Sequence, residues 1–387
     1  MIVSKNSIYF ALQLIKAHET IPHNRKPHHL YMPIDYGCIC IGSYHSQRNH
    51  FFIMTNEDYY NIKDRLSPSM IGTILQSCPA DVQRKLIYGV EETPAMARGT
   101  LGHAATLEPD RVRDEFVLFD RTKLKGAGSI AKVPKYKKDG TPDVNTENLL
   151  MVESFKQECE QAGKTAVIDT EEYAKIQRVA GILHNHPFWQ IINDGALIEH
   201  AMLWSADNGC PMRGKADHIN DTYGIVSDVK FMADISPEAI IRSVYDRMYH
   251  GQIASYQDGY GKTSGKQGTI NLGVVIACDI KTLDVVVYGL PDTYTEAKDN
   301  WTNYSEYFTR ELRPLWKDIS IQTGRELYQR ATERWLDWNQ RYGNCWETVE
   351  SVDEETGEVK ITPVNQWPGW DFISRFDPGN KLRIFKL

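Results

Sequence analysis

The sequence lacks any apolar run long enough to cross a membrane. Nowhere in its 387 residues do about 18 consecutive apolar residues occur, the length that a transmembrane helix needs. The first residues also lack the basic, apolar and small-residue order of a secretory signal. We therefore expect an intracellular, cytoplasmic protein without a membrane partner.

Cysteine is scarce and unpatterned. The chain has seven cysteines, scattered along its length, and no two of them form a C-x-x-C motif. In a reducing compartment this distribution is typical of buried or inactive thiols. We predict no disulfide bonds.

Positive charge is not in excess. The 51 acidic and 44 basic side chains give a formal net charge of −7, which argues against a protein covered overall by nucleic acid. The net charge does not exclude a local basic groove, because a site built from carboxylates would itself add negative charge to the sum. The composition, 41% hydrophobic and 25% charged, is that of a globular protein with a sizeable core.

Residues 1–53 differ in composition from the rest. They hold six of the twelve histidines, with Cys38 and Cys40 between them. A C-x-C pair followed by widely spaced histidines matches no zinc pattern with its usual short ligand spacings, so we interpret the segment as a poorly ordered appendage rather than a metal site. An alternative is that translation starts at Met54, because a polar opening and then an amphipathic helix follow that residue.

From Ser67 onward the sequence has the pattern of a folded α/β domain. Ser67 and Pro68 suit the N-cap and first position of a helix. Apolar spacing predicts further helices at 95–109, 170–193 and 237–260. Alternating residues predict strands at 196–204, 210–220, 225–231, 272–279 and 283–290, the last two as a hairpin. A helical region rich in Trp and Tyr follows from about 292 to 343, and then a hairpin or loop at 351–364.

One segment, residues 121–143, is strongly basic. Its lysines are interspersed with glycine and proline, a composition typical of a mobile loop. The lysines are Lys123, Lys125, Lys132, Lys135, Lys137 and Lys138.

Asp217, Asp228 and Lys230 form the pattern that carries chemistry. Residues i and i+2 of a strand share a face, so Asp228 and Lys230 project together while Val229 points into the core. Two carboxylates can hold a hard cation such as Mg²⁺, and a neighbouring lysine can orient water and stabilise charge on phosphorus. The alternative, a surface ion pair, is common and contributes only about 0–1 kcal/mol.

Several separated motifs resemble the exodeoxyribonuclease VIII (RecE-type) family, exonucleases of the PD-(D/E)XK superfamily. They are "LSPSMI", "RGTLGHAATLEP", "FDRTK", "GKTAVIDTEEY", "HNHP", "IEHAMLW", "GKADHIN", "GIVSDVK" and "YHGQIASYQDGY", in this order between residues 66 and 312. The resemblance implies an α/β fold with a central mixed β-sheet flanked by helices, to which a helical C-terminal region is added. It implies that residues 54–315 form the exonuclease domain and residues 316–387 an extension.

The resemblance also implies roles for individual residues. Asp217 and Asp228 would bind the metal together with the carbonyl of Val229, and Lys230 would be the catalytic lysine. His103 would be an additional metal ligand; otherwise it is a core or capping histidine. Glu199 would bind a second metal or a water; otherwise it is an acid on a strand face.

DNA contacts are expected from two further regions. Gln252 and Tyr256 lie at i and i+4 of one helix and therefore on one face, where they could hold the scissile phosphate or the terminal nucleotide. Tyr249 and Tyr260 beside them are interpreted as packing residues. Arg121, Lys123, Lys125 and the rest of the lysine segment would contact the DNA backbone, or else form an ordinary solvated loop.

The implied activity is Mg²⁺-dependent degradation of linear double-stranded DNA from its 5′ ends, with Mn²⁺ as an alternative metal. The expected partners are double-stranded DNA ends, a single-strand annealing protein and further copies of this chain in a ring, in the bacterial host of a phage or prophage. A PD-(D/E)XK endonuclease and a non-catalytic DNA-binding recombination protein remain alternatives. A nuclease with an iron–sulfur cluster is disfavoured, because only Cys345 lies beyond Cys278.

Overall fold

The computed structural model describes residues 54, 56–90, 93–296, 319–352, 357 and 359–369. The appended segment expected at residues 1–53 and the boundary expected after residue 315 lie outside these ranges. The five cysteines within them are all free thiols.

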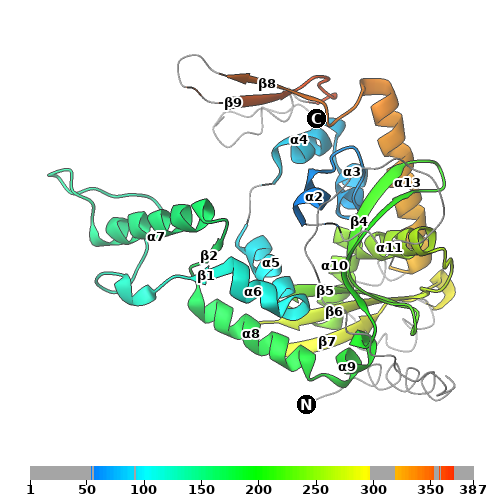
Figure 1. Cartoon of the computed structure of the whole chain (residues 1–387), viewed down its shortest axis with the longest axis horizontal. Coiled ribbons are helices and arrows are strands. Elements are labelled where there is room, and N and C mark those ends of the chain that lie inside the picture. The colour runs from blue at the N-terminus through cyan, green and yellow to red at the C-terminus, as the bar shows by residue number, and fades with distance from the viewer. Residues whose placement is uncertain are drawn as a thin grey trace, which may run out of the picture.

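A five-stranded mixed sheet forms the centre of the protein (Figure 1). Its strands lie in chain order, and neighbours are antiparallel except for the parallel pair β5 and β6. The strands are β3 (Leu197–Ser205), β4 (Pro211–Asn220), β5 (Ile225–Met232), β6 (Leu272–Asp279) and β7 (Asp284–Gly289). The expected central mixed sheet flanked by helices, and the expected β6–β7 hairpin, are confirmed.

Helices cover both faces of this sheet, and each face has its own core. Along β6, Val275 and Ala277 join one core while Val274 and Ile276 join the other, and all four are fully buried. This double burial explains why β6 reads as an almost continuous apolar run rather than an alternating one. Helices α3 (Ile71–Gln76), α10 (Pro237–Arg247), α11 (Tyr249–Ser264) and α13 (Ile321–Tyr342) contribute to the first core. Helices α5 (Pro94–Leu107), α6 (Pro109–Glu115), α8 (Thr170–His184) and α9 (Pro187–Asn193) contribute to the second.

Two helices predicted as continuous are each broken into two, so those predictions were wrong. The helix expected at 170–193 ends at His184, and His186 caps the next helix, whose first residue is Pro187. A proline disfavours helical backbone in the residue before it, which explains this break. The helix expected at 237–260 is interrupted at Met248, which adopts a left-handed conformation with φ of 54°. The apolar spacing continues across Met248, which is why the sequence pattern did not show this break.

The remaining N-terminal elements are α2 (Asn56–Asn61), the 3-10 turn η1 (Pro68–Met70) and α4 (Pro79–Tyr88). Of these, η1 contacts β4 and α11, and α4 packs against α3. Pro68 begins η1 as expected of a first helical residue, although the side chain of Ser67 makes no capping hydrogen bond.

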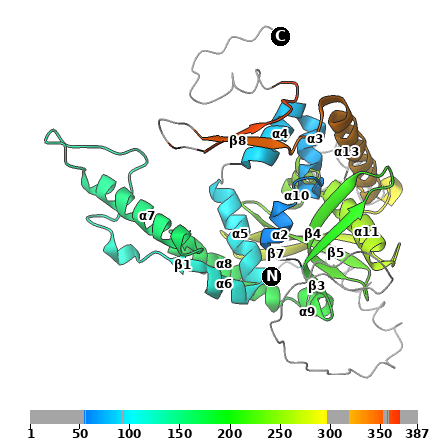
Figure 2. The same cartoon turned by 45° about the horizontal axis from the view of Figure 1, so that its top comes forward.

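A separate arm projects beyond α6 and α8, on the side opposite α13 (Figures 1 and 2). It contains β1 (Phe116–Leu118), the 3-10 turn η2 (Arg121–Lys123), α7 (Val144–Gln161) and β2 (Thr165–Val167). Strands β1 and β2 pair in parallel as a small sheet of their own at its base. We call residues 116–167 the arm.

The C-terminal elements share the main core. Gly324 of α13 packs so closely on α11 that a Cβ there would lie 2.3 Å from the carbonyl oxygen of His250. Trp335 of α13 and Trp367, which lies beyond α13 in the sequence, are both buried, each with 1% exposure. The hairpin of β8 (Thr348–Val352) and β9 (Val359–Pro363) follows α13, where the sequence indicated a hairpin or loop.

Candidate metal and phosphodiester site

The site lies where the ladder between β3 and β4 is interrupted. Ile198 pairs with His218 and His200 with Ala216, but the intervening positions, Glu199 and Asp217, form no regular pair. Glu199 has a φ of 48°, a conformation that non-glycine residues adopt rarely and at a cost. Strain of this kind in a strand is concentrated at functional sites, where it redirects a side chain.

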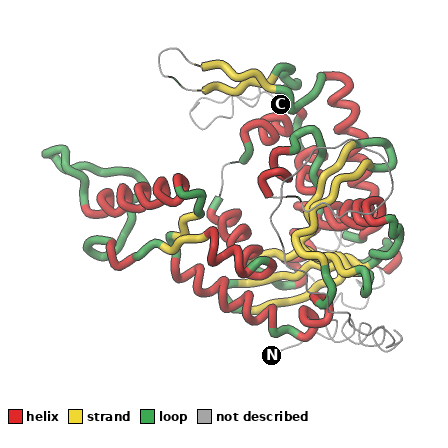
Figure 3. Tube along the Cα trace, in the orientation of Figure 1, coloured by secondary structure: helices red, strands yellow, loops and turns green. Residues whose placement is uncertain are grey.

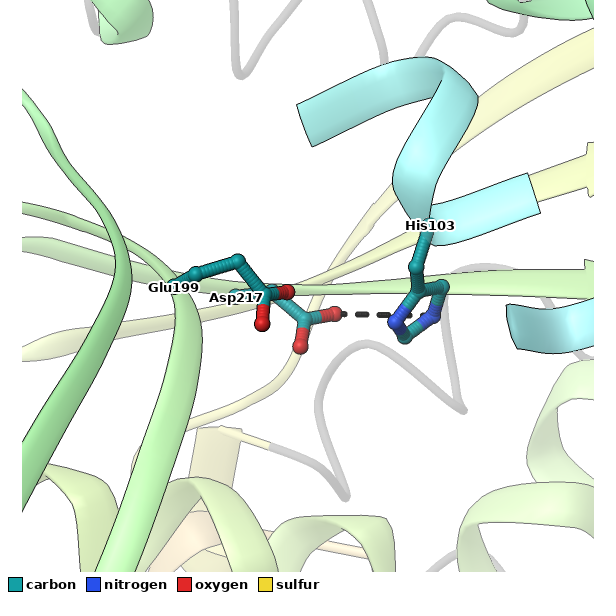
Figure 4. Close-up of side chains that lie close together, drawn as sticks. All are labelled: His103, Glu199 and Asp217. Atoms are coloured by element: carbon teal, nitrogen blue, oxygen red, sulfur yellow. Dashed lines mark ion pairs between the residues drawn. The ribbon is translucent and has the colours of Figure 1, made fainter. Parts of the chain in front are cut away.

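Across this interruption, the side chains of the β3–β4 pair change the face of the sheet to which they point. In β4, Met212 and Ala216 belong to the first core, but so does Ile219, three residues further on. An undisturbed strand would put Ala216 and Ile219 on opposite faces. The strands β3 and β4 are strongly curved (Figure 3). The side chains of Glu199 and Asp217 are both directed toward α5, which carries His103 (Figure 4).

Helix α5 brings His103 to this turn. A Cβ on Gly102 would lie 2.3 Å from the ring of Phe231, so only glycine allows α5 to approach β5 this closely. His103 Nε2 lies 2.5 Å from the carbonyl oxygen of Val229 and 3.8 Å from Oδ2 of Asp217 (Figure 4). One ligand atom each from His103, Glu199 and Asp217 can be chosen so that all three lie within 4.8 Å of one another.

Asp228 and Lys230 form a buried pair beside these residues. Nζ of Lys230 lies 2.8 Å from Oδ1 and 2.7 Å from Oδ2 of Asp228, whose exposure is 1%. Nζ of Lys230 also lies 4.9 Å from the centre of the Tyr249 ring, a cation–π contact. The alternative of a solvated surface pair does not describe this arrangement, because both side chains are largely removed from water.

The peptide between these two residues links the site together. The N–H of Val229 donates to Oδ2 of Asp217 at 2.7 Å, while its carbonyl contacts His103. Because a carbonyl oxygen only accepts, this contact is a hydrogen bond in the tautomer that has its proton on Nε2, whereas in the other tautomer Nε2 can bind a metal. The side chain of Val229 is fully buried, as the strand alternation predicted.

Burial and mutual repulsion shift the pKa values of the acids. Burial and the nearby Asp228 raise the pKa of Asp217 to about 7. Burial and the charge of Asp217 likewise raise the pKa of Glu199. Burial would lower the pKa of Lys230, but Asp228 and Asp217 outweigh it and raise that pKa. The lysine is therefore a permanent cation and donor.

Lys215 is a site residue that the sequence analysis missed. Its ammonium group contacts Oε2 of Glu199, and the side chains are only 13% and 12% exposed. The available signal was its position two residues before Asp217 in "GKADHIN", which we used only as part of a motif. Lys215 thus holds the carboxylate that the ladder interruption turns toward Asp217.

The donor set fits a hard divalent cation. Three carboxylates, Glu199, Asp217 and Asp228, are balanced by two lysines. Among the residues that the structure describes, no donor makes a well-aligned hydrogen bond to the buried Oδ2 of Asp228. Carboxylate and carbonyl oxygens are the ligands that Mg²⁺ and Mn²⁺ prefer, and a cation would relieve the repulsion that raises the pKa of Asp217.

Gln252 and Tyr256 lie beneath the site rather than on an open surface. Nε2 of Gln252 donates to Oη of Tyr256 at 2.8 Å, and Tyr256 is 4% exposed. Burial and the charge of Asp228 raise the pKa of Tyr256 well above its usual value. Tyr249 and Tyr260 are buried in the first core, as their interpretation as packing residues predicted. Tyr249 also contacts Lys230, and Tyr260 donates to Asp221 near the other end of α11.

The structure does not bring Arg121, Lys123 and Lys125 to the site. They lie on the exposed surface of the arm, and Lys125 pairs with Glu147 of α7. Their expected contact with DNA remains a prediction.

A comparison with known families shows which class of domain carries this site. The family described as "PDDEXK-like domain of unknown function" (DUF3799) matches residues 67–310, which is more than half of the chain. The chain belongs to this PDDEXK-like family. The matched range contains His103, Glu199, Asp217, Asp228 and Lys230, so the cluster built above lies wholly within the PDDEXK-like domain.

Other comparisons add less. No curated protein matches the chain. A solved structure titled "Crystal structure of SSO0001" is similar at 16% sequence identity, with a TM-score of 0.20. The match covers 36% of this chain and spans 59% of the length of that structure.

Membership in the PDDEXK-like family indicates a metal-dependent nuclease. The acidic cluster of His103, Glu199 and Asp217 is consistent with the metal dependence of such enzymes. Within the described ranges, none of the helices combines the length and apolar composition needed to span a membrane.

Proposed function

We propose that this PDDEXK-like protein is a metal-dependent exodeoxyribonuclease that degrades linear double-stranded DNA from 5′ ends. The products would carry 3′ single-stranded tails for phage-type homologous recombination. The observation that carries the nuclease chemistry is the convergence of His103, Glu199 and Asp217 beside the Asp228–Lys230 pair. The direction and the duplex substrate are supported by the motifs that resemble the exodeoxyribonuclease VIII family.

Asp217, Asp228 and the carbonyl of Val229 would hold the metal, with His103 and Glu199 as further ligands. When bound, Mg²⁺ or Mn²⁺ supplies Lewis acidity and lowers the pKa of water. Lys230, kept protonated by its two acidic neighbours, donates to the oxygen on which negative charge develops. Gln252 and Tyr256 are hydrogen-bonded to each other next to this part of the site. Tyr256 lies near enough to Asp228 for the carboxylate charge to raise the pKa of the tyrosine.

The partners follow from the same proposal. The substrate would be a double-stranded DNA end, the product would pass to a single-strand annealing protein, and several copies of the chain would form a ring around the duplex. The protein would act in the cytoplasm of a bacterium that carries a phage or prophage. Within the chain, residues 54–315 would form the nuclease domain, and α13 of the extension supports it by packing on α11.

Cleavage of end-labelled DNA tests this function directly. Linear duplexes labelled at either the 5′ or the 3′ ends, and a covalently closed circle of the same length, are incubated with the protein in Mg²⁺ or in chelator. Asp228→Ala and Lys230→Met test the site, and Asp258→Asn, which alters a carboxylate on α11 outside the cluster, is the control. We expect early release of the 5′ labels, an intact circle, and loss of activity by about 10²-fold or more in the two site variants.

Each other outcome has its own meaning. Cleavage of the circle would show a PD-(D/E)XK endonuclease instead. Early release of the 3′ labels would reverse the proposed direction. No metal-dependent cleavage of either DNA would leave a non-catalytic DNA-binding protein with this fold.

A further inference from the structure

The arm carries an unusually one-sided charge. Residues 121–138 include seven basic side chains and no acidic one, although the whole chain has a net charge of −7. All seven of these side chains belong to exposed residues. Only Lys125 has a close ion pair among the described residues, with Glu147.

The acids that border this segment are engaged with the backbone. Asp120 accepts from the N–H of Thr122, Asp139 from that of Thr141, and Asp143 from that of Thr146 at the start of α7. These contacts fix turns at the two ends of the segment. The segment keeps an excess of positive charge, because its seven cations face only four neighbouring carboxylates in the described part of the chain, those of Asp120, Asp139, Asp143 and Glu147.

Two buried polar side chains of α7 fix the path of the segment. Asn148 accepts from the N–H of Lys125 and donates to the carbonyls of Lys125 and Ser129. Thr146 accepts from the N–H of Lys135 and donates to its carbonyl. Both Asn148 and Thr146 are 0% exposed. The expectation of a mobile loop was therefore wrong, because main-chain groups of the segment are bonded to a helix at two points.

The second half of the segment is a small hairpin. Tyr136 and Pro142 form an antiparallel bridge, and the N–H of Lys137 donates to the carbonyl of Thr141. Lys137 and Lys138 therefore lie at its turn, and the ring of Tyr136 between two lysines is 60% exposed. Exposed lysines on a segment held by hydrogen bonds, together with an exposed tyrosine, can bind a nucleic-acid backbone, whose phosphates are regularly spaced anions.

We infer that the arm is a second DNA-binding element, which holds the sugar-phosphate backbone of duplex DNA away from the metal site. This inference rests on the proposed function, because it takes DNA as the substrate. The arm projects beyond α6 and α8, the helices next to α5, which carries His103 (Figure 1). Lysines there contact DNA that the metal site does not touch, so they contribute to affinity rather than to the chemical step.

Salt-dependent binding tests the inference without cleavage. The affinity for a blunt linear duplex is measured in Ca²⁺ at several KCl concentrations, for the wild type and for Lys135→Gln, Lys137→Gln and Lys138→Gln combined. The control combines Lys175→Gln, Lys281→Gln and Lys360→Gln, which removes the same charge from exposed positions outside the arm. The plot of log affinity against log salt has a negative slope, and each lost phosphate contact reduces its steepness by about 0.9. We expect a decrease of about 2–3 for the arm variant and little change for the control.

A second variant separates the shape of the arm from its charge. Thr146→Val keeps every lysine but removes the hydroxyl that binds the main chain of Lys135. We expect weaker DNA binding with intact charge, and circular dichroism shows whether α7 remains folded. In cleavage assays both arm variants should raise KM and leave kcat unchanged, since no arm residue belongs to the metal cluster.

The possible outcomes keep this inference apart from the proposed function. A slope that equals the wild-type slope in the arm variant would overturn the inference and assign the cations to solvent or to an acidic protein surface. Normal DNA binding through the arm without any cleavage would overturn the nuclease function but not the arm. A fall in kcat with unchanged KM would also contradict the inference, because it would place the arm in the chemical step.

Discussion

Nε2 of His103 lies 2.5 Å from the carbonyl oxygen of Val229, the residue between Asp228 and Lys230. The N–H of the same residue donates to Asp217. A single stretch of β5 therefore connects helix α5, the acid of β4 and the acid–lysine pair. Movement of α5 relative to β5 would disturb all of these groups together.

The first prediction uses the close approach of α5 to β5. Gly102→Ala would place a methyl group 2.3 Å from the ring of Phe231 and push the helix outward. We expect a loss of about 1–3 kcal/mol in the free energy of unfolding and a fall of about 10²-fold in nuclease activity, because small displacements of reacting groups are costly. Urea unfolding and the end-label assay measure the two effects.

Gly99 provides the matched control in the same helix. A Cβ at Gly99 meets nothing within 4 Å, so Gly99→Ala should stabilise α5 by up to about 1 kcal/mol and leave activity unchanged. Equal losses in both variants would show that the close contact at Gly102 does not position the site.

The second prediction concerns Lys215. Lys215→Met leaves the carboxylate of Glu199 buried without its cation, which we expect to cost about 3–5 kcal/mol in the metal-free protein. The loss of the positive charge should also tighten Mn²⁺ binding, measured by calorimetry. Lys215→Arg keeps the positive charge and should have the wild-type affinity. Weaker Mn²⁺ binding in Lys215→Met would show that the lysine orders Glu199 for the metal rather than competing with it. Lys262→Met, which breaks ion pairs with Asp207 and Asp258, is the control.

The third prediction concerns the packing of α13 on α11. Gly324→Ala would place its Cβ 2.3 Å from the carbonyl oxygen of His250. This backbone atom of α11 cannot move away as easily as the end of a flexible side chain. We expect a loss of about 1–3 kcal/mol in the free energy of unfolding. Gly181→Ala in α8 faces open space and should be neutral or stabilising. Unfolding of α13 before the rest of the protein, rather than in one transition, would contradict a shared core.

The fourth prediction concerns acid stability. Burial lowers the pKa of His218 to about 4 from an ordinary value of 6.5, so below pH 6.5 the unfolded chain takes up a proton that the native state does not. This group therefore costs stability as the pH falls from 6.5 to 4, by about 3 kcal/mol in total. The pKa of Asp217 is raised, so the native state takes up a proton before the unfolded chain does, and this group adds stability as the pH falls from 7 to 3.8.

A comparison of variants isolates the histidine. We expect the stability of His218→Phe relative to wild type to increase as the pH is lowered through this window, measured by urea unfolding in chelator. His218 contacts the ring of Trp189, which a phenyl group can also do. A difference between the two proteins that is independent of pH would contradict a buried neutral histidine.

Much of the local structure followed from the sequence. All five strands of the sheet were predicted close to their observed bounds, because strand alternation depends on neighbouring residues. The breaks before Pro187 and at Met248 were not predicted. The left-handed conformation of Met248 depends on how α10 and α11 pack, since the nearest glycine, Gly251, lies inside α11 rather than at the break.

The sequence by itself determined which residues can do chemistry, since the spacing of Asp228 and Lys230 places them on one face of any strand. Only the tertiary structure decided how they are assembled. The reversed φ of Glu199, the role of Lys215 and the approach of α5 all depend on contacts between segments far apart in the chain. The same is true of the lysine segment, whose composition indicated mobility while two side chains of α7 fix its path. Composition describes what a segment can do alone, but a hydrogen bond to a distant helix depends on where the rest of the fold places that helix.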